Sequence, residues 1–576
     1  MAQKLHKIRH SLSHIMAMAV KELFPEAKLA IGPVIEDGFY YDFEVSQNFT
    51  PEDLPKIEKK MKKIIKQNIS FEKIEIPYEK AKKKVSDQPY KKELLEEITK
   101  KGEKITFYKS SSFTDLCAGP HVKLSKEIKA DAFKLTKVAG AYWRGDEKNK
   151  MLQRIYGVAF TTKKELAKYL KQKKEARKRD HRKLGQELEL FAFHEVSPGA
   201  PFWLPKGMII FRELEKLWRQ IHDQAGYQET STPILNHKSL WVKSGHWQHY
   251  KDNMFNLKID DEIYSLKPMN CPGSTYIYNT KKRSYRDLPL RYSEIGRLHR
   301  NEVKGALGGL FRVRQITMDD AHIYCLKKQI QSEIGRLLKL IKKFYKIFGF
   351  SPNFVLATRP EKFMGETEDW DQAEKDLKKA LENNKIDYQL SKKDGAFYGP
   401  KIDIHIDDTL GRTWQMATIQ LDFQIPKRFN LVYTDKKGLE KVVTLIHRAI
   451  FGSFERFFGI LVEHYAGAFP IWLSPVQIQI VPVGSSHISF SKKLAQKFKD
   501  ENIRVDVDTA NETVGNKIRK AIKQKVPYML VIGDKEMNSD KLSVRIRSEK
   551  DLWNVKKEDF IKKVQDKITN RIVKLK

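Results

Sequence analysis

The sequence contains little cysteine, no long apolar run and relatively few acidic residues. Three cysteines in 576 residues, at positions 117, 271 and 325, cannot form a disulfide framework, so we expect a cytoplasmic protein. No apolar run approaches the ~20 residues that a membrane-spanning helix needs, and we therefore predict no membrane partner. Near the N-terminus, the apolar run from Ile15 to Val20 is stopped by Lys21, which indicates an amphipathic helix and not an export signal.

The charge balance is strongly basic. Lysine and arginine total 108 against 73 acidic residues, which gives a formal net charge of +35. Such an excess favours a polyanionic partner, with nucleic acid the first candidate and an anionic membrane surface the second. Lysine added only for solubility would produce the same numbers. Hydrophobic residues make up 40% of the chain, which is typical of folded proteins, and the length predicts three or four domains.

Changes in pattern along the chain predict where these domains begin and end. Residues 163–183 contain eleven Lys or Arg residues and three acidic residues, without Gly or Pro, and predict a solvated helix between two domains. A mixed α/β unit with a hairpin at LAIGPVIEDGFYYDFEV precedes it. After it, GMIIFRELEKLWRQIHDQAGY predicts a helix with Phe211, Leu214, Leu217, Trp218 and Ile221 on one apolar face. The closely spaced strand-like segments YQETSTPIL, DEIYSLKPMN, LRYSEIGRLHRNE and FRVRQITMDDAHIYC then predict a large antiparallel sheet. Short strands and helices after Pro475 indicate a further α/β domain. The predicted parts are 1–162, a basic helical linker 163–190, 191–472 and 473–576.

Two segments carry residues suited to binding a nucleotide. The stretch 297–314, RLHRNEVKGALGGLFRVR, predicts a strand, a glycine-containing turn and a returning strand that carry Arg300, Glu302 and Arg312. An arginine fork can hold a phosphate, and a carboxylate can accept from an adenine amino group. Residues 447–461, HRAIFGSFERFFGIL, place Arg456 at the start of a helix, where a second phosphate can bind. Taken alone, Arg–Glu pairs in strands are usually structural.

Together with the segment that runs from the preceding helix to TSTPIL and ends at Pro233, these segments resemble the three motifs of class II aminoacyl-tRNA synthetases. MNCPG, SGHW, DDAH, GAFYGPKID, TIQLDF and IHRAIFGSFERF narrow the resemblance to the threonyl-tRNA synthetases, over residues 5–570. The resemblance implies a multidomain α+β and α/β protein with an α/β editing domain, an antiparallel catalytic core and a C-terminal α/β anticodon-binding domain. It also implies a homodimer through the Pro233 region, in a form that lacks the small N-terminal domain of many bacterial relatives.

The resemblance further implies one catalytic Zn²⁺ per subunit, held by Cys271, His322 and His447. Spacing alone does not indicate this site, because a buried thiol and two hydrogen-bonded histidines are the ordinary interpretation. Three protein ligands leave an open position, which the threonine amino and hydroxyl groups take in this family. Valine lacks the hydroxyl and forfeits a metal bond, whereas an apolar pocket would select only about a hundredfold. Asp320 is expected to receive the substrate ammonium group.

The implied reaction is attack of the threonine carboxylate on the α-phosphorus of ATP, with Mg²⁺ and arginines neutralising the charge. Arg300 is assigned to the α-phosphate, Glu302 to the adenine amino group and Arg456 to the γ-phosphate. Lys401 is expected beside the reacting groups and His246 near the terminal ribose of the tRNA. The other expected substrate-binding residues are Tyr398, Met269, Gln415, Gln420, Thr418, Ser453 and Arg312.

Four positions depart from the family pattern. Met318 replaces a common Gln, Ile316 replaces an aromatic residue that stacks on adenine, and Met416 replaces a small residue. Ser274 replaces the His that usually follows MNCPG. These changes affect the details expected of the nucleotide and amino-acid pocket.

A second histidine and cysteine pattern lies near the N-terminus. His10 and His14 are spaced to share a helical face, and Cys117 and His121 lie in the turn-rich DLCAGPH. Such a set could bind zinc, position water without metal, or consist of two unrelated structural pairs. The pattern resembles the editing domain of threonyl- and alanyl-tRNA synthetases, which implies hydrolysis of misattached serine, and we favour hydrolysis without metal. Asp115 and Lys91 match further family positions.

At the C-terminal end, Asn511, Glu536 and Arg545 match positions at which the family reads splayed anticodon bases. The expected partners are therefore threonine tRNA, ATP and L-threonine. One alternative is a non-catalytic protein that binds structured RNA as a regulator, although such a protein has no need of Arg300, Arg456 or the zinc ligands. A prolyl or seryl enzyme of the same class is disfavoured by the cysteine and two histidines.

Overall fold

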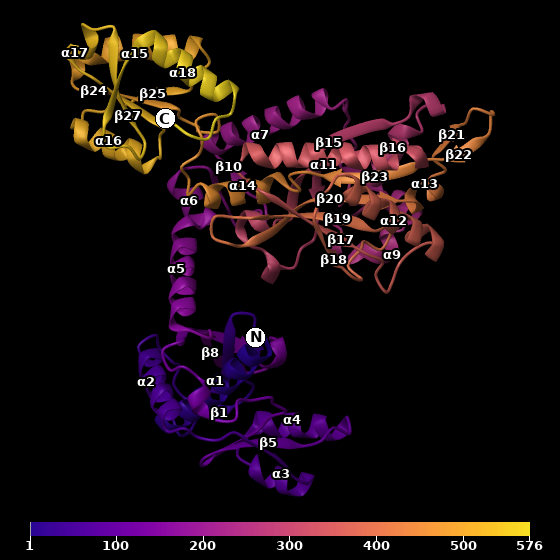
Figure 1. Ribbon diagram of the computed structural model, residues 1–576, viewed down its shortest axis with the longest axis vertical. Coiled ribbons are helices and arrows are strands. Elements are labelled where there is room, and N and C mark those ends of the chain that lie inside the picture. Colours follow the sequence, from indigo (N-terminus) through magenta and orange to yellow (C-terminus); the bar gives the residue numbers. More distant parts are fainter. Residues whose placement is uncertain (1, 576) are drawn as a thin grey trace. The chain divides into compact units, whose positions relative to one another are not determined.

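The computed structural model describes residues 2–575 and divides into two compact units, one up to Lys174 and one from Glu175 (Figure 1). In the described residues, no helix is both long and apolar enough to cross a bilayer. The linker prediction needs one correction. Instead of a single helix over 163–183, α5 ends at Arg179 and a separate helix, α6 (His181–Glu187), follows it. Asp180 breaks the helix because its side chain accepts from the backbone N–H of Arg182 and caps α6.

Among the described residues, the first unit contains two sheets, four α-helices and most of a fifth, α5, which continues past Lys174. The larger sheet has the order β1-β3-β8-β7, with β2 added to β3 through the expected hairpin, which pairs Val34 with Phe39. The smaller sheet has the order β4-β5-β6. The elements of this unit are α1 (Ala2–Leu23), β1 (Lys28–Leu29), β2 (Val34–Ile35), β3 (Gly38–Glu44), α2 (Asp53–Lys66), β4 (Glu72–Glu75), α3 (Tyr78–Lys84), α4 (Pro89–Lys100), β5 (Thr106–Ser110), β6 (Phe113–Leu116), β7 (Phe133–Tyr142), β8 (Met151–Ala159) and α5 (Lys163–Arg179).

The core of the first unit forms where α1 and α2 pack on the larger sheet. Ile15 of α1, Ile57 of α2 and Tyr41 of β3 are fully buried in one apolar cluster. The face of α1 opposite its charged residues is therefore fixed against the sheet, which confirms the amphipathic helix expected at the N-terminus. The positions of His10 and His14 along this helix follow from that packing.

The second unit is built around an eight-stranded sheet of order β11-β15-β16-β23-β20-β19-β17-β18. All pairs are antiparallel except the two at the edges, which are parallel. The strands are β11 (Gln228–Glu229), β15 (Leu290–His299), β16 (Gln315–Cys325), β23 (Thr444–Ala449), β20 (Thr413–Asp422), β19 (Lys401–Asp407), β17 (Pro352–Ala357) and β18 (Tyr388–Ser391). The large antiparallel sheet expected from the sequence is confirmed.

Two expectations about this sheet are wrong in detail. DEIYSLKPMN does not join it, because β14 (Glu262–Leu266) pairs with β12 (Leu235–His237) and β13 (Asn256–Ile259) in a separate sheet. The returning strand of the 297–314 segment begins only at Gln315. Arg312 and Arg314 therefore lie on a loop that contains two 3₁₀ turns, at Lys304–Ala306 and Gly309–Phe311.

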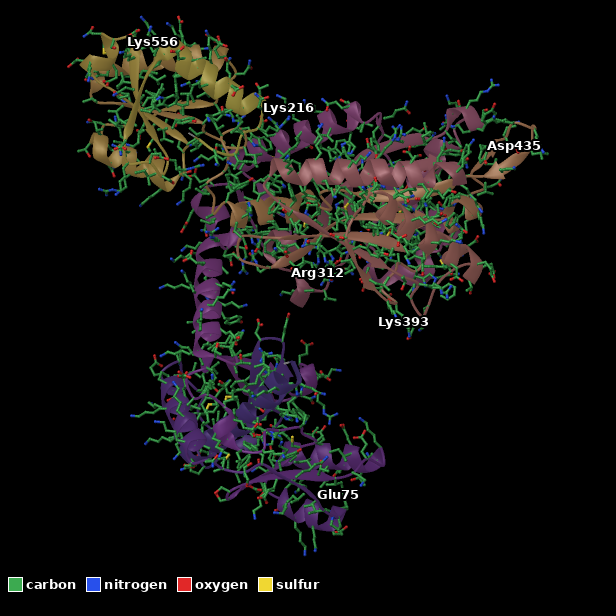
Figure 2. The ribbon with its side chains drawn as sticks, viewed as in Figure 1. Glu75, Lys216, Arg312, Lys393, Asp435 and Lys556 are labelled. Atoms are coloured by element: carbon green, nitrogen blue, oxygen red, sulfur yellow. The ribbon has the colours of Figure 1, made fainter. Side chains whose placement is uncertain are left out.

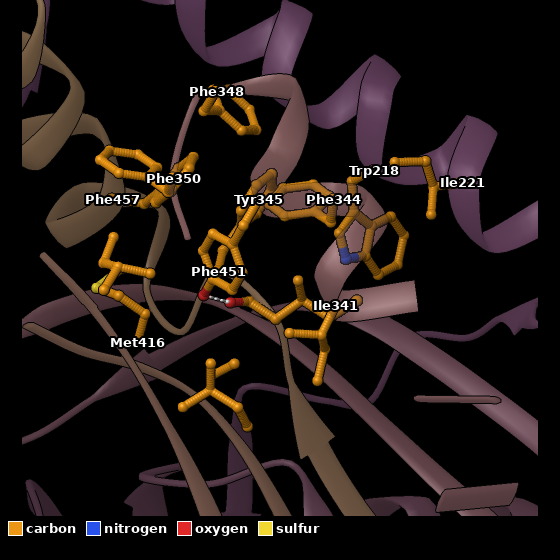
Figure 3. Packing of buried hydrophobic residues seen from close by; sticks show 14 of the residues in the cluster. Trp218, Ile221, Ile341, Phe344, Tyr345, Phe348, Phe350, Met416, Phe451 and Phe457 are labelled. Atoms are coloured by element: carbon orange, nitrogen blue, oxygen red, sulfur yellow. Dashed lines mark hydrogen bonds between the residues drawn. The ribbon is translucent and has the colours of Figure 1, made fainter. Parts of the chain in front are cut away.

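Helices cover the eight-stranded sheet, and their apolar faces form a core with it. In α7, Phe211, Leu214, Leu217, Trp218 and Ile221 are buried on one face, as expected from their spacing. Figure 3 shows Trp218 beside Phe344 of α11, with Phe451 and Phe457 further along the same apolar cluster. The helices and short strands around the sheet are β9 (Phe191–Ala192), β10 (Phe202–Trp203), α7 (Pro205–Gln224), α8 (Lys238–Ser244), α9 (His246–Tyr250), α10 (Cys271–Tyr278), α11 (Ile330–Ile347), α12 (Thr367–Asn383), α13 (Gln424–Arg428), β21 (Val432–Thr434), β22 (Glu440–Val442) and α14 (Phe454–His464).

The C-terminal part has its own mixed sheet of order β25-β24-β26-β27-β28 and its own apolar core. The α/β organisation expected here is confirmed. Its elements are β24 (Ile478–Pro482), α15 (Ile488–Asp500), β25 (Val505–Val507), α16 (Val514–Lys523), β26 (Tyr528–Ile532), α17 (Asp534–Met537), β27 (Lys541–Ile546), β28 (Leu552–Lys556) and α18 (Lys557–Thr569).

Candidate active site and editing site

A thiol and two imidazoles converge on one face of the large sheet. His322 of β16 pairs directly with His447 of β23, so both side chains project to the same side, and Cys271 begins α10 above them. The ligand atoms of the three residues lie within 4.8 Å of one another, and all three residues are buried. Nε2 of His322 has no hydrogen-bond partner among the described residues. A buried imidazole nitrogen without a partner beside a thiol is a suitable metal ligand.

Asp422 orients one of these imidazoles. Its Oδ2 lies 2.9 Å from Nε2 of His447, and its Oδ1 accepts the backbone N–H groups of Gln424 and Ile425. With the proton on Nε2, the Nδ1 lone pair of His447 is available to a metal. Burial lowers the pKa of His447, but the hydrogen bonds and charges of Asp422 and Cys271 outweigh it and raise the pKa to about 10, so a metal ion at Nδ1 would take the place of a proton there. Burial alone lowers the pKa of His322 well below its usual value.

Asp320 lies two residues before His322 on the same face of β16, and its Oδ2 accepts from Nδ2 of Asn270 at 3.2 Å. Burial raises the pKa of Asp320 to about 6. The preceding Asp319 has the opposite orientation and accepts from Arg448 and Trp218 in the core. The two neighbouring aspartates of DDAH therefore have different environments, one beside the candidate metal ligands and one inside the fold.

Strands β19 and β20 extend the same surface. Lys401 pairs with Gln420, which pairs with His447 on the next strand, and the hydroxyl of Tyr398 donates to Gln420. Thr418 accepts from Gln420 at 3.2 Å. The remaining expected residue of β20, Gln415, is exposed and pairs with His405 at a register shift between β19 and β20.

His246 contributes a neutral imidazole to this region. Its Nδ1 lies 2.9 Å from the hydroxyl of Ser244 and its Nε2 lies 3.1 Å from the sulfur of Met269. Burial lowers the pKa of His246 to about 4. Two residues that the sequence assigned to different roles, His246 and Met269, are thus in direct contact.

The residues assigned to ATP lie around the loop that joins β15 to β16. The backbone N–H of Arg300 donates to the carbonyl of Arg314, which closes the base of the loop, and the side chain of Arg312 pairs with Glu302 at 2.7 Å. Figure 2 marks Arg312 on this loop. Arg456 is held at the start of α14 because Ser453 caps the helix and accepts from its backbone N–H. Nε of Arg456 is buried and has no partner among residues 2–575, as expected of a group that binds an anion.

In the first unit, the two histidine and cysteine pairs meet in one pocket. Sγ of Cys117 lies 3.4 Å from Nε2 of His10 and 3.4 Å from Nε2 of His121. The ring of His14 lies 4.4 Å from that of His121, measured between centroids, and its Nδ1 has no partner among the described residues. Burial lowers the pKa of all three histidines and raises the pKa of Cys117 to about 11. The interpretation as two unrelated pairs is therefore wrong.

Lys91 and Asp115 form a buried ion pair of 2.7 Å under this pocket. The hydroxyl of Tyr41 donates to the other oxygen of Asp115 at 2.7 Å.

In the C-terminal part, Glu536 accepts from the hydroxyl of Ser543. Arg545 lies two residues further along β27, and its buried Nε lacks a partner among the described residues. Asn511 is exposed on the loop before α16.

Comparisons with known proteins agree with this organisation. Family profiles match residues 255–465 as the tRNA synthetase class II core domain (G, H, P, S and T), 477–567 as an anticodon binding domain, and 105–156 as the threonyl and alanyl tRNA synthetase second additional domain. The chain is 53% identical to a threonine–tRNA ligase of Clostridium tetani over 98% of its length and 88% of the relative. It is 54% identical to that of Clostridium botulinum over 98% of its length and 89% of the relative.

The chain belongs to the threonine–tRNA ligase family. Among solved structures, the RNA binding domain of threonyl-tRNA synthetase from Cryptosporidium parvum superposes with a TM-score of 0.65 and 40% identity, over 67% of this chain and 98% of that one. A putative threonyl-tRNA synthetase from Aeropyrum pernix matches with a TM-score of 0.60 and 26% identity, over 69% and 98%. The class II core, the editing-type domain and the anticodon-binding domain expected from the sequence are confirmed.

The four departures from the threonine–tRNA ligase pattern have structural explanations. Ser274 forms a buried hydrogen bond of 2.7 Å with the hydroxyl of Tyr324. Met416 is part of the core, so it changes packing under the site. Ile316 and Met318 lie together in a small apolar cluster beside the β15–β16 loop, which gives this part of the site an aliphatic wall.

Sequence reasoning missed three residues that support the site. Asp422 and Asn270 lie inside quoted motifs, TIQLDF and MNCPG, but nothing in their spacing indicates that one orients His447 and the other contacts Asp320. His181 was treated as part of a solvated helix, although it is 2% exposed. The Asp180 that precedes it is a helix-capping residue, and this was the available signal that a new helix begins there.

Proposed function

We propose that this chain activates L-threonine with ATP and transfers it to threonine tRNA at a zinc site formed by Cys271, His322 and His447. The observation that carries this proposal is the convergence of one thiol and two imidazoles within 4.8 Å, from three distant parts of the sequence. A protein that only binds RNA has no use for such a set. The same set argues against a prolyl or seryl specificity.

The residues present are suitable for zinc. The donors are one sulfur and two nitrogens, His322 has a nitrogen without a partner, and Asp422 holds His447 in one tautomer. Bound there, Zn²⁺ would supply an open position for the amine and hydroxyl of threonine. Asp320, on the same strand face as His322, is placed to receive the substrate ammonium group.

We assign the activation step to residues around the β15–β16 loop. Arg300 binds the α-phosphate, Arg456 the γ-phosphate and Glu302 the adenine amino group, with Mg²⁺ carried by ATP. Lys401 of β19 and Tyr398, just before it, line the reacting carboxylate and phosphate, with Thr418 of β20 as a further substrate-binding residue. Gln415 and Gln420 of β20 lie along the adenylate. The attacking carboxylate of threonine is already ionised, so no general base is required, and the catalytic effect is positioning and charge stabilisation. His246 acts near the terminal ribose during transfer.

A second reaction follows from the chemistry of the substrate. Serine lacks only one methyl group, which a synthetic site can distinguish by about 1–3 kcal/mol. We propose that His10, His14, Cys117 and His121 hydrolyse serine from the tRNA by positioning water, without a metal. Both nitrogen contacts of Cys117 are hydrogen bonds to imidazoles, and its raised pKa keeps it a neutral thiol that does not act as a nucleophile.

The remaining partners are also proposals. Asn511, Glu536 and Arg545 read anticodon bases, which the unpartnered guanidinium nitrogen of Arg545 supports. A homodimer forms through the Pro233 region, where Ile234 and Leu235 are each 42% exposed. We propose a cytoplasmic location, because all three cysteines are free.

Threonine-dependent exchange of pyrophosphate into ATP tests the main proposal. Purified protein with measured zinc content should catalyse exchange with threonine and not with valine, and should charge threonine tRNA. Folded, zinc-loaded protein without exchange would instead favour the RNA-binding alternative. Hydrolysis of serylated tRNA, assayed separately, tests the editing proposal.

A further inference from the structure

A buried histidine outside the proposed zinc site links two parts of the ATP-binding region. His181 is the first residue of α6 and is 2% exposed, although its neighbours Asp180 and Arg182 are accessible. Burying an imidazole is unfavourable unless its nitrogen atoms have partners, so both ring nitrogens must be accounted for.

Both nitrogens of His181 have a defined partner. The backbone N–H of Leu310 donates to Nε2 at 3.0 Å. A backbone N–H can only donate, so Nε2 carries a lone pair and the proton lies on Nδ1. Nδ1 then donates to Oε1 of Glu463, 2.7 Å away, and the same oxygen accepts the backbone N–H of His181 at 3.0 Å. Arg412 pairs with the other oxygen of Glu463.

These contacts also argue against a metal ion at this position. Asp180, His181 and Glu463 lie close enough together to hold one. However, the nitrogens of His181 are both used, Glu463 is neutralised by Arg412, and Asp180 pairs with Arg182. A cation would have to displace hydrogen bonds that already satisfy every donor and acceptor.

The other partner of His181 lies on the β15–β16 loop. Leu310 is the middle residue of the 3₁₀ turn Gly309–Phe311, just before Arg312. The ring of Phe311 lies 4.1 Å from the ring of His181 and 4.5 Å from that of Trp414, measured between centroids. The guanidinium carbon of Arg456 lies 5.7 Å from the Trp414 ring. His181 is thus connected to the loop that carries Arg312 and, through two aromatic rings, to Arg456.

We infer that His181 is a positioning residue for ATP: its neutral Nε2 holds Leu310, and its contact with Glu463 thereby fixes the β15–β16 loop against α14, the helix whose first turn carries Arg456. This inference rests on the proposed function, since it concerns the nucleotide that this loop binds. An exposed loop that is ordered before the ligand arrives loses less conformational entropy on binding. The contact therefore acts on ATP and leaves the threonine site unaffected.

Two variants distinguish the loss of the hydrogen bond to Leu310 from other effects of replacing the His181 side chain. In His181→Asn the amide occupies the position of Nδ1 and can still donate to Glu463, but it does not reach Leu310. In His181→Gln the amide oxygen can occupy the position of Nε2 and accept from Leu310. The loss of one buried hydrogen bond predicts that KM for ATP in the exchange reaction rises about tenfold in His181→Asn, with KM for threonine unchanged and with recovery in His181→Gln. Exposed His194→Asn is the matched control.

A second pair of variants tests the same contact from the loop. A Cβ on Gly309 would lie 2.3 Å from Nε2 of His181 and 2.9 Å from Cγ of Arg182, and the φ of +56° at this position disfavours alanine, so Gly309→Ala displaces the loop from α6 while leaving the His181 side chain in place. A Cβ on Gly305, in the same loop, meets nothing within 4 Å, and Gly305→Ala is the control. We expect a raised KM for ATP, and faster amide hydrogen exchange of the loop, in Gly309→Ala only.

The outcomes distinguish this inference from the proposed function. Absence of threonine-dependent exchange in the wild type would refute the proposed function itself. Wild-type KM for ATP in both His181→Asn and Gly309→Ala, or equal defects in Gly305→Ala, would overturn the role of His181. Equal increases in KM for ATP and for threonine would also overturn it, because they indicate general structural damage.

Discussion

His322 and His447 are direct neighbours across β16 and β23, with ring centroids 5.1 Å apart and ring planes at 83°. Antiparallel pairing alone therefore places two imidazoles side by side, and the start of α10 adds the thiol of Cys271. The candidate metal centre lies on the most regular part of the fold, where the backbone hydrogen bonds of three adjacent strands fix the positions of the ligands.

We expect Cys271→Ser to lose bound zinc and threonine activation. Serine replaces a soft thiolate donor with a neutral hydroxyl, which zinc binds poorly. Cys325→Ala is the control, because Cys325 is buried in the core at the end of the same β16 and is not part of the cluster. Elemental analysis and pyrophosphate exchange measure the two effects. Stoichiometric zinc in purified Cys271→Ser would contradict the metal assignment.

His322→Ala should abolish threonine activation and leave tRNA binding largely intact. The residue contributes a ligand to the amino-acid site, whereas the tRNA contacts proposed in the C-terminal part are far along the sequence. Filter binding of labelled tRNA and pyrophosphate exchange on the same preparation separate the two properties. Activation at the wild-type rate would remove His322 from the site.

Asp422→Asn should weaken zinc binding by about 10–100-fold. The amide keeps Oδ1, which accepts the backbone N–H groups of Gln424 and Ile425, but its nitrogen cannot accept a proton from Nε2 of His447. Competition with a chelating dye gives the change in zinc affinity. Unchanged affinity would show that the tautomer of His447 does not depend on this carboxylate.

In the editing pocket, His14→Ala or Cys117→Ala should slow hydrolysis of serylated tRNA by about 100-fold or more, with charging of threonine unaffected. His6→Ala is the control, since His6 is exposed one turn earlier on α1. Deacylation of purified serylated tRNA is the measurement. If hydrolysis continues at the wild-type rate, the editing reaction occurs elsewhere.

The buried Lys91–Asp115 ion pair is expected to stabilise the folded first unit. Lys91→Met leaves a buried carboxylate without its partner and should destabilise the first unit by about 3–5 kcal/mol. Adding Asp115→Asn removes the charge, keeps an acceptor for Tyr41, and should restore much of this loss. The exposed pair of Lys104 and Glu75 provides the control, because Lys104→Met should cost less than about 1 kcal/mol. Hydrogen exchange in residues 2–174 measures each change, and equal effects of the two lysine substitutions would contradict the prediction.

Much of the fold was predictable because its signals are local. The apolar face of α7, the Val34–Phe39 hairpin and the C-terminal α/β pattern all follow from spacing within a few residues. The set of strands that belong to the large sheet was not predictable. β14 looks in sequence like a strand of that sheet but pairs with β12 and β13 in a separate one. Choosing between such partners depends on tertiary packing that no short window contains.

The candidate sites likewise combine residues that the sequence indicated with residues whose roles depend on tertiary contacts. Resemblance to a family supplied Cys271, His322 and His447, while their distances in sequence gave no indication of a metal centre. The supporting residues Asp422, Asn270 and His181 act through single contacts with residues far away in the chain. A carboxylate or an imidazole in isolation looks the same in a sequence whether it orients a ligand or faces solvent, so only coordinates reveal such roles.

The wide separation of the three candidate ligands also affects how the protein matures during synthesis. Cys271 leaves the ribosome long before His447, and the two cannot meet until β23 has inserted between β16 and β20. A shortened or incompletely assembled chain therefore lacks the complete set of ligands proposed for zinc, because long-range strand pairing of this kind forms late. Occupancy by metal would then serve as a readout of whether translation and folding of the central domain have been completed.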